Sequence, residues 1–144
     1  MEIRKVLTAT GSTLLISGLF ATPSLADAKY PGNPGSGLSP IVIKTLVIPF
    51  NNNVSTLSKV QIRTINSAAK LKNTKFTISG YASNSGDKKY NLRLSKKRAE
   101  AIESQILNLQ PGANTFAKGF GVLVNEQCNK YENRCVVVTI TQQN

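Results

Sequence analysis

One arginine lies where the pattern of a predicted helix calls for an apolar residue. Leu94, Ile102 and Ile106 are spaced by eight and four residues, which places them on one face of a helix, and Arg98 falls midway between the first two. A guanidinium on that face needs an anionic or carbonyl partner, because burying it unpaired is prohibitive. The spacing favours equally a ligand-binding arginine and one that reaches the helix edge or pairs with a structural carbonyl.

Asn91 and Ser95 lie on the same helix face as Arg98, at i, i+4 and i+7. Three hydrogen-bonding side chains are therefore expected to converge near the polar loop Tyr81–Gly86. This convergence predicts a small polar site.

Catalytic chemistry is disfavoured by composition. The chain has no histidine, and its few carboxylates beyond the N-terminus form no acid–base pair at a shared motif. Glu100 and Glu103 are interpreted as surface ion pairs of the helix that carries Lys96 and Lys97. We therefore expect no catalytic residue, no metal site and no cofactor.

Six elements are needed to position these residues. The second helix should run from Lys88 to Leu109 and stop before Pro111-Gly112, while Ser58 and Gln61 form a capping box at the start of the first. The strands are expected at 41–50, 75–79, 115–120 and 135–141. This order predicts an α/β two-layer sandwich, β-α-β-α-β-β, with both helices packed on one face of a mixed four-stranded sheet.

The N-terminus has the pattern of a signal peptide. Arg4 and Lys5 precede the apolar run 6–20, and small residues allow cleavage after Ala26 or Ala28. A membrane anchor is the alternative, but the run is shorter than the ~20 apolar residues of a span. We predict a signal peptide at 1–26, a flexible Pro/Gly/Ser linker at 27–40 and one domain at 41–144, exported to the periplasm or to the cell wall and exterior, with no membrane span.

Positive charge dominates the chain. Its net charge is +11, and removal of residues 1–26 leaves 16 basic and 6 acidic residues, a net charge of +10. Outside the cytoplasm the fitting partners are anionic wall polymers, lipid head groups or peptidoglycan, rather than nucleic acid. A basic surface that only aids solubility is an equally good interpretation.

Cys128 and Cys135 are the only cysteines. An exported chain favours a disulfide between them over two free thiols, and without histidine no zinc site can be completed. The bridge would close a loop of eight residues and contribute roughly 2–3 kcal/mol.

Four segments together resemble the OmpA-like C-terminal domain family, over about 46–140. They are Gly80-Tyr81-Ala82-Ser83-Asn84-Ser85-Gly86, the YNxxLSxxRA pattern at 90–99, Gly119-Phe120-Gly121 and Asn133-Arg134-Cys135-Val136. The resemblance implies the same fold order and a module that binds peptidoglycan by gripping the diaminopimelate of the stem peptide.

Residue by residue, the resemblance gives Arg98 the role of binding the diaminopimelate carboxylate, with Asn91 beside it. Planar guanidinium suits a carboxylate because both can bond bidentately. Arg134 matches the first arginine of the family's N-R-R-V pattern and is expected to line or brace the pocket, while Tyr81 belongs to the binding loop.

The chain departs from the family at the loop aspartate that accepts from the diaminopimelate ammonium, where Ser83 stands. A hydroxyl supplies no charge, so the contact should be weaker. Asp87 could compensate if the loop folds back. Cys135 replaces the second family arginine, and the usual helical insert is shortened to a loop at 122–133, which the disulfide would staple.

Two functions remain open. The first is a non-catalytic peptidoglycan-binding domain with a weakened diaminopimelate site. The alternative is an OmpA-like fold kept as a structural or protein-interaction module without specific peptidoglycan recognition. The sequence also leaves a homodimer open.

Overall fold

The computed structural model describes residues 39–143. The predicted signal peptide and most of the predicted linker lie outside these residues. The elements follow in the order β1 (Val42–Pro49), α4 (Lys59–Ala68), β2 (Thr74–Gly80), α5 (Lys88–Leu109), β3 (Asn114–Gly119), the 3-10 helix η2 (Glu126–Tyr131) and β4 (Cys135–Gln142).

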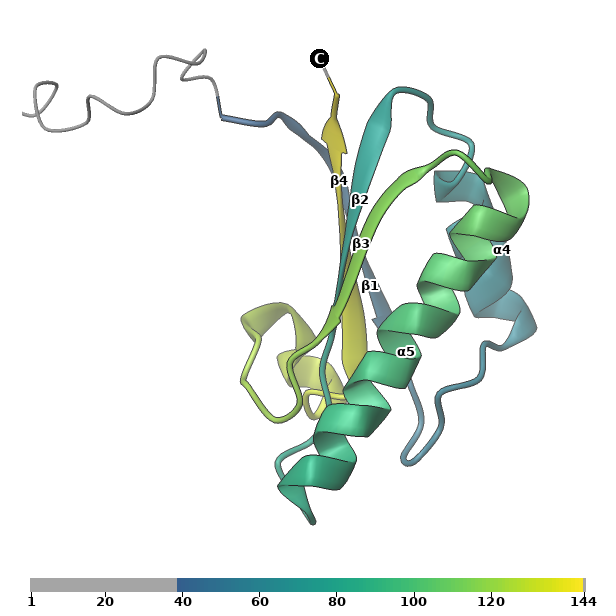
Figure 1. Cartoon of the computed structure of the whole chain (residues 1–144). Helices are drawn as coiled ribbons and strands as arrows, with labels where there is room; N and C mark the ends of the chain where they lie inside the picture. Colours follow the sequence, from purple (N-terminus) through teal and green to yellow (C-terminus); the bar gives the residue numbers. More distant parts are fainter. Residues whose placement is uncertain (1–38, 144) are drawn as a thin grey trace, which may run out of the picture. The chain divides into compact units, whose positions relative to one another are not determined.

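The four strands form one mixed sheet in the order β1-β4-β2-β3. Strand β4 pairs antiparallel with both β1 and β2, and β3 joins β2 in parallel. Both helices cover the same face of the sheet, and the segment with η2 lies on the other side at the lower end in Figure 1. The predicted α/β sandwich is confirmed.

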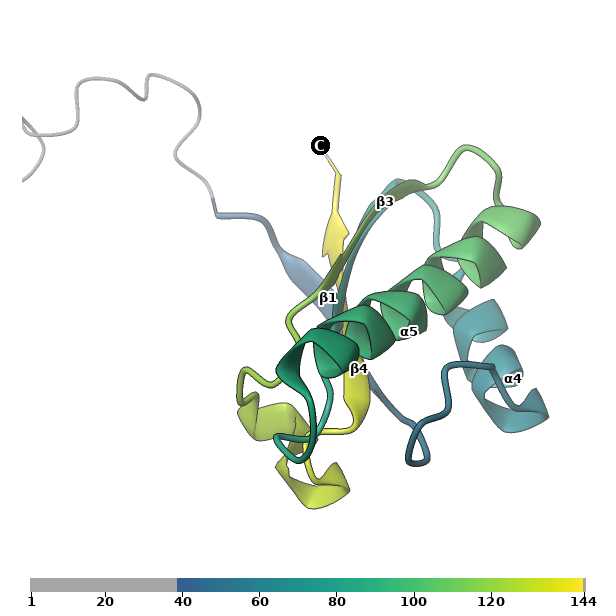
Figure 2. The ribbon, with the colours of Figure 1, turned by 60° about the horizontal axis from the view of Figure 1, so that its bottom comes forward.

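Local sequence signals account for the helix starts. The hydroxyl of Ser58 accepts from the amide of Gln61, whose side chain in turn accepts from the Ser58 amide, so the capping box is present. Asp87 caps α5 by accepting from the Tyr90 amide at 2.6 Å. Figure 2 shows α5 lying across the sheet.

Helix α5 approaches the sheet closely because two strands end in glycine. A Cβ at Gly80 would collide with the Ser95 carbonyl, and one at Gly119 would lie 2.5 Å from the amide nitrogen of Lys96. A side chain at either position would therefore push α5 away from β2 and β3.

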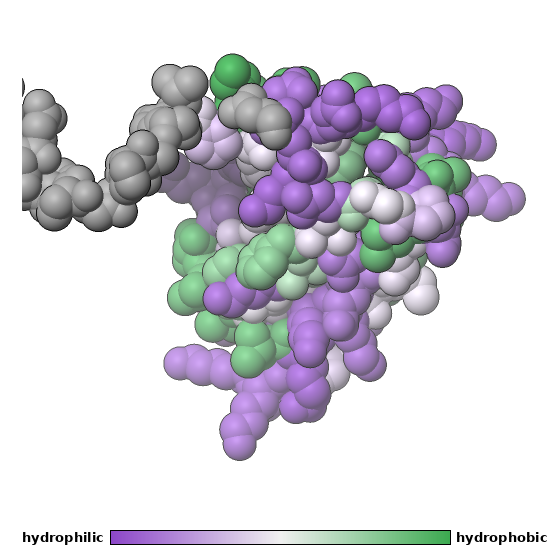
Figure 3. Space-filling model, turned by 45° about the horizontal axis from the view of Figure 1, so that its top comes forward, coloured by the Kyte–Doolittle hydropathy of each residue, from purple (hydrophilic) through white to green (hydrophobic). Residues whose placement is uncertain are grey.

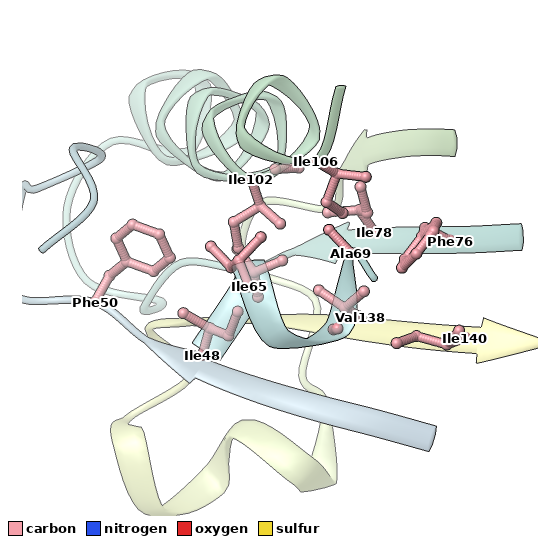
Figure 4. Close-up of a cluster of buried hydrophobic side chains, with 13 residues drawn as sticks. Ile48, Phe50, Ile65, Ala69, Phe76, Ile78, Ile102, Ile106, Val138 and Ile140 are labelled. Atoms are coloured by element: carbon pink, nitrogen blue, oxygen red, sulfur yellow. The ribbon is translucent and has the colours of Figure 1, made fainter. Parts of the chain in front are cut away.

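The main core lies between the helices and the sheet. Figure 4 shows side chains from both helices meeting those of β1, β2 and β4. Its fully buried aliphatic members include Ile65, Ile78, Ile102, Ile106 and Ile140. Alternation along β4 sends Val136, Val138 and Ile140 into this core, as the pattern predicts.

A second, smaller cluster lies on the opposite face of the sheet. It contains Tyr81, Cys128, Cys135 and Val137, with Val47, Phe120 and Tyr131 packed against it. The predicted disulfide is confirmed: Cys128 and Cys135 are bonded, with their Cα atoms 5.6 Å apart. The cluster and its disulfide hold η2 against the start of β4.

Two sequence predictions need correction. The segment 122–133 is not all loop, because it contains η2. Asn125 is the N-cap of η2, and its side-chain oxygen accepts from the Gln127 amide at 2.9 Å. Within residues 39–143, Glu100 and Glu103 form no salt bridge; Glu103 instead accepts a hydrogen bond from the Thr115 hydroxyl at 2.7 Å. Among the same residues, no helix has the length and apolar character needed to cross a membrane.

Candidate functional site

Arg98 is fully buried, with 0% of its surface exposed. Its guanidinium donates to three backbone carbonyls: Nε to Val54 at 2.8 Å, one terminal nitrogen to Asn51 at 2.9 Å and the other to Tyr81 at 3.1 Å. It also stacks over the Phe50 ring, 5.2 Å from the ring centre. The side chain therefore ties the segment after β1 to the end of β2.

Burial, and secondarily the positive charge of Arg134, lower the pKa of Arg98 from its usual value to about 10. The group stays cationic at neutral pH. A guanidinium has five N–H groups, so two of them have no partner among residues 39–143.

Asn91 and Ser95 also lie toward loop 81–86, as their spacing predicts. The Asn91 amide donates to the carbonyl of Ser85 at 2.7 Å. The Ser95 hydroxyl accepts from the amide of Gly121 at 2.8 Å, and the Gly121 carbonyl accepts from the Ala82 amide at 2.8 Å. The polar face of α5 thus holds the backbone of loop 81–86, directly through Asn91 and indirectly through Ser95.

The two loop residues of the predicted site differ in exposure. The Tyr81 side chain is buried in the second cluster, where its ring stacks on Phe120 with centroids 5.4 Å apart. The Ser83 side chain faces outward, and its hydroxyl lies 2.8 Å from that of Ser85.

Asn133 joins the loop to the η2 segment. Its side-chain amide donates to the carbonyls of Ala82 and Leu123, at 2.9 and 2.8 Å, and its oxygen accepts from the Asn125 amide at 3.1 Å. The first residue of the predicted Asn133-Arg134 motif is therefore a structural clamp.

Arg134 lies beside Glu132 at the end of the sheet. The two side chains form a bidentate pair, with N–O distances of 2.9 and 3.3 Å, and they are 26% and 69% exposed. The hydrogen bond from Arg134, together with its charge, lowers the pKa of Glu132 below its usual value of 4.5.

A hollow of about 360 Å³ brings Ser83 and Arg134 together. Its lining is polar except for two valines and consists of Ser83, Asn84, Ser85, Val122, Val124, Asn129, Glu132, Asn133 and Arg134. Of the predicted site residues, Ser83 and Arg134 line this hollow. Arg98, Asn91 and Tyr81 do not line it; Asn91 donates to the carbonyl of Ser85, a lining residue, and Arg98 donates to the carbonyl of Tyr81.

Sequence reasoning missed Glu132, the carboxylate of this hollow. Its position two residues before Arg134 was the available signal, because a pair at that spacing can meet when the backbone turns. Asp87, considered as the compensating acid, is instead engaged in capping α5. No three side chains of the kinds that bind metals gather within residues 39–143.

A half-buried guanidinium, a carboxylate, hydroxyls and amides around one hollow can hold a small ligand that carries both charges. Fold and hollow together define a two-layer α/β domain with a polar surface site at one end of its sheet. The model of the OmpA family matches residues 49–127, and the chain belongs to that family.

Solved structures share the fold. The peptidoglycan-associated lipoprotein of Burkholderia pseudomallei is 20% identical, with a TM-score of 0.55, over 65% of this chain and 88% of that one. The OmpA-like domain of FopA1 from Francisella tularensis is 23% identical, with a TM-score of 0.51, over 69% and 72%. A MotB-like protein of Desulfovibrio vulgaris is 18% identical, with a TM-score of 0.55, over 69% and 75%. No match was found among curated protein sequences.

Proposed function

We propose that this chain is a non-catalytic peptidoglycan-binding domain of the cell envelope. The observation that carries the proposal is the hollow in which the loop residue Ser83 and the motif residue Arg134 meet. Membership in the OmpA family supports it, as does the shared fold of a structure named a peptidoglycan-associated lipoprotein. The ligand is the diaminopimelate part of a stem peptide.

The predicted site residues divide into two roles. Arg134 and Ser83 face the hollow and contact the ligand, Arg134 through a carboxylate and Ser83 through a weaker hydrogen bond to an amine. Arg98, Asn91 and Tyr81 are positioning residues, since their polar contacts fix the backbone of loop 81–86 and the segment after β1. The two remaining N–H groups of Arg98 can serve a carboxylate only if the loop moves outward.

Surface charge adds affinity without specificity. The first half of α5 exposes five cations: Lys88, Lys89, Arg93, Lys96 and Lys97. No acidic residue lies in the first turn of α5, although the partial positive charge of a helix N-terminus favours anions there. This arrangement does not favour the helix, but it attracts anionic wall polymers in a salt-dependent way.

The predicted signal peptide and the family together support a place in the periplasm or wall. We propose export, with the mature chain starting at residue 27 or 29. Mass spectrometry of the N-terminus of the protein recovered from the envelope checks this directly.

Binding to purified peptidoglycan tests the function. The Arg134→Ala variant should bind at least about 10-fold more weakly, since a hydrogen-bonded charged contact contributes about 1.5–3 kcal/mol. Arg93→Ala, which removes the same charge from an exposed position on α5, is the matched control and should lose much less. Equal retention of wild type and Arg134→Ala would contradict a specific hollow.

A second candidate is an interaction module, and an exposed strand edge favours it. Strand β1 lies at the edge of the sheet, and Ile41, Val42 and Ile43 at its start are 44–68% exposed. Figure 3 shows apolar side chains grouped among hydrophilic ones on one face of the molecule. If wild type shows no retention on peptidoglycan but sediments as a dimer, this candidate, with pairing between copies, replaces the first.

A further inference from the structure

Glu132 is held in an unusual backbone conformation beside the hollow. It ends η2 with φ 52° and ψ 40°, and Asn133 follows with φ 61°. Two consecutive residues other than glycine in the left-handed region are costly and persist only where the surroundings fix them. Here the amides of Glu132 and Asn133 donate to the carbonyls of Asn129 and Cys128, at 3.0 and 3.1 Å.

The Arg134 guanidinium already holds a carboxylate in the way it would hold a ligand. Glu132 approaches it with both oxygens, one on each terminal nitrogen, which is the pairing that a bidentate ligand carboxylate would make. The Nε of Arg134 is buried and has no hydrogen-bond partner among residues 39–143. Because Glu132 is mostly exposed, its side chain can turn away from Arg134 while the backbone stays in place.

We infer that Glu132 supplies the negative charge that Ser83 lacks. The inference rests on the proposed function and names the acid of that same hollow. The ligand carboxylate takes the place of the Glu132 carboxylate on Arg134, and Glu132 then accepts the ligand ammonium. One ion pair within the protein is thus exchanged for two with the ligand, and every charge keeps a partner.

This exchange selects a ligand that carries both charges close together, as each amino-acid end of diaminopimelate does. A ligand with only a carboxylate displaces Glu132 from Arg134 and leaves the Glu132 carboxylate without a cationic partner. A ligand with only an ammonium leaves the Arg134–Glu132 pair intact and must compete with it. Selectivity for the zwitterion follows from the pairing itself.

Within the described residues, no other carboxylate lines the hollow. Asp87 is engaged with the Tyr90 amide. The Ser83 hydroxyl is paired with Ser85 and has no charge. In this chain the acid therefore comes from Glu132 at the end of η2, and not from the position of Ser83 in the loop after β2.

Titration of the folded protein with two matched ligands tests the inference. Meso-diaminopimelate and pimelate share the seven-carbon dicarboxylate chain, but only the first carries amines. Wild type should bind diaminopimelate more tightly than pimelate. The Glu132→Gln variant should bind diaminopimelate about 10-fold more weakly, with pimelate binding unchanged or tightened.

Two further variants complete the design. Glu126→Gln removes an exposed acid from the same short helix outside the hollow and should bind diaminopimelate as wild type does. Ser83→Asp combined with Glu132→Gln returns the acid to the loop and should restore most of the lost affinity. Unfolding midpoints of all variants confirm that each is folded.

Unchanged or tighter diaminopimelate binding by Glu132→Gln would overturn the inference, since Glu132 would then only compete for Arg134. If such a variant also keeps its retention on peptidoglycan, the inference fails while the proposed function stands. Absence of wild-type binding to both diaminopimelate and peptidoglycan would remove the proposed function and this inference with it.

Discussion

The two faces of the sheet are built by different means. The helix-covered face carries a large cluster of aliphatic side chains from both helices and three strands. The opposite face carries four buried residues, two of them a disulfide, and a stacked pair of aromatic rings. The first face stabilises the fold by area buried from water, whereas the second depends on a covalent link and a few polar clamps.

This difference shows where the domain can change. The hollow is formed by the loop after β2 and the segment stapled to the second cluster. The two departures from the family pattern that the resemblance implies, at Ser83 and Cys135, fall on this side. The residues around the hollow can therefore vary without loss of the core that both helices cover.

Arg98 is the one buried charged residue within residues 39–143, and its replacement should have the largest effect. Arg98→Met keeps much of the volume but leaves the carbonyls of Asn51, Val54 and Tyr81 without their donor. We expect unfolding to cost about 3–5 kcal/mol less free energy, measured by urea denaturation. Arg93→Met, at an exposed site, should stay within about 0.5 kcal/mol of wild type; a similar result for Arg98→Met would show that Arg98 does not support the fold.

Removal of the disulfide should separate the two faces. The Cys128→Ala/Cys135→Ala double variant should lose roughly 2–3 kcal/mol. Hydrogen exchange should then speed up in η2 and the start of β4, with α5 and β2 still protected. Wild type treated with reductant serves as the control and should behave the same way. Uniform loss of protection would mean that the two clusters form one cooperative unit.

Acid should weaken the Arg134–Glu132 pair on the second face, and this should be the smallest of the three effects. Because its pKa is lowered in the folded state, Glu132 contributes stability above its unfolded pKa, and this contribution is lost as pH falls through the folded pKa. The gap in melting temperature between wild type and Glu132→Gln should be constant near neutral pH and close below pH ~4. If the difference in melting temperature persists in acid, the stabilisation by Glu132 comes from packing and not from its charge.

Periodicity and capping were enough to predict the two long helices and the four strands, but not η2. These elements depend on residues that are close together in the sequence, so local patterns predict them. Examples are the alternation in β4, the capping box of Ser58 and Gln61, and the apolar stripe on α5. The partners of Arg98 are backbone carbonyls 17 to 47 residues away, and no side-chain pattern marks a carbonyl. The spacing of residues on α5 therefore identified Arg98 as a buried charge, but it did not predict whether Arg98 binds a ligand or the backbone.

Glu132 escaped prediction for a different reason. Its pairing with Arg134 requires two left-handed residues in succession, a backbone state that Glu and Asn rarely adopt together. The disulfide and the clamp made by Asn133 stabilise that state, and both are contacts made only in the folded chain.

Strand β4 (Cys135–Gln142) follows the other described strands in sequence, yet it lies between β1 and β2. Neither of those strands has its antiparallel partner until β4 is available, so the sheet cannot be completed before that segment has been made. If the chain is exported N-terminus first, as the predicted signal peptide implies, it would remain unfolded while it crosses the membrane. The sheet would close, and Cys128 and Cys135 would meet, only after β4 had crossed the membrane.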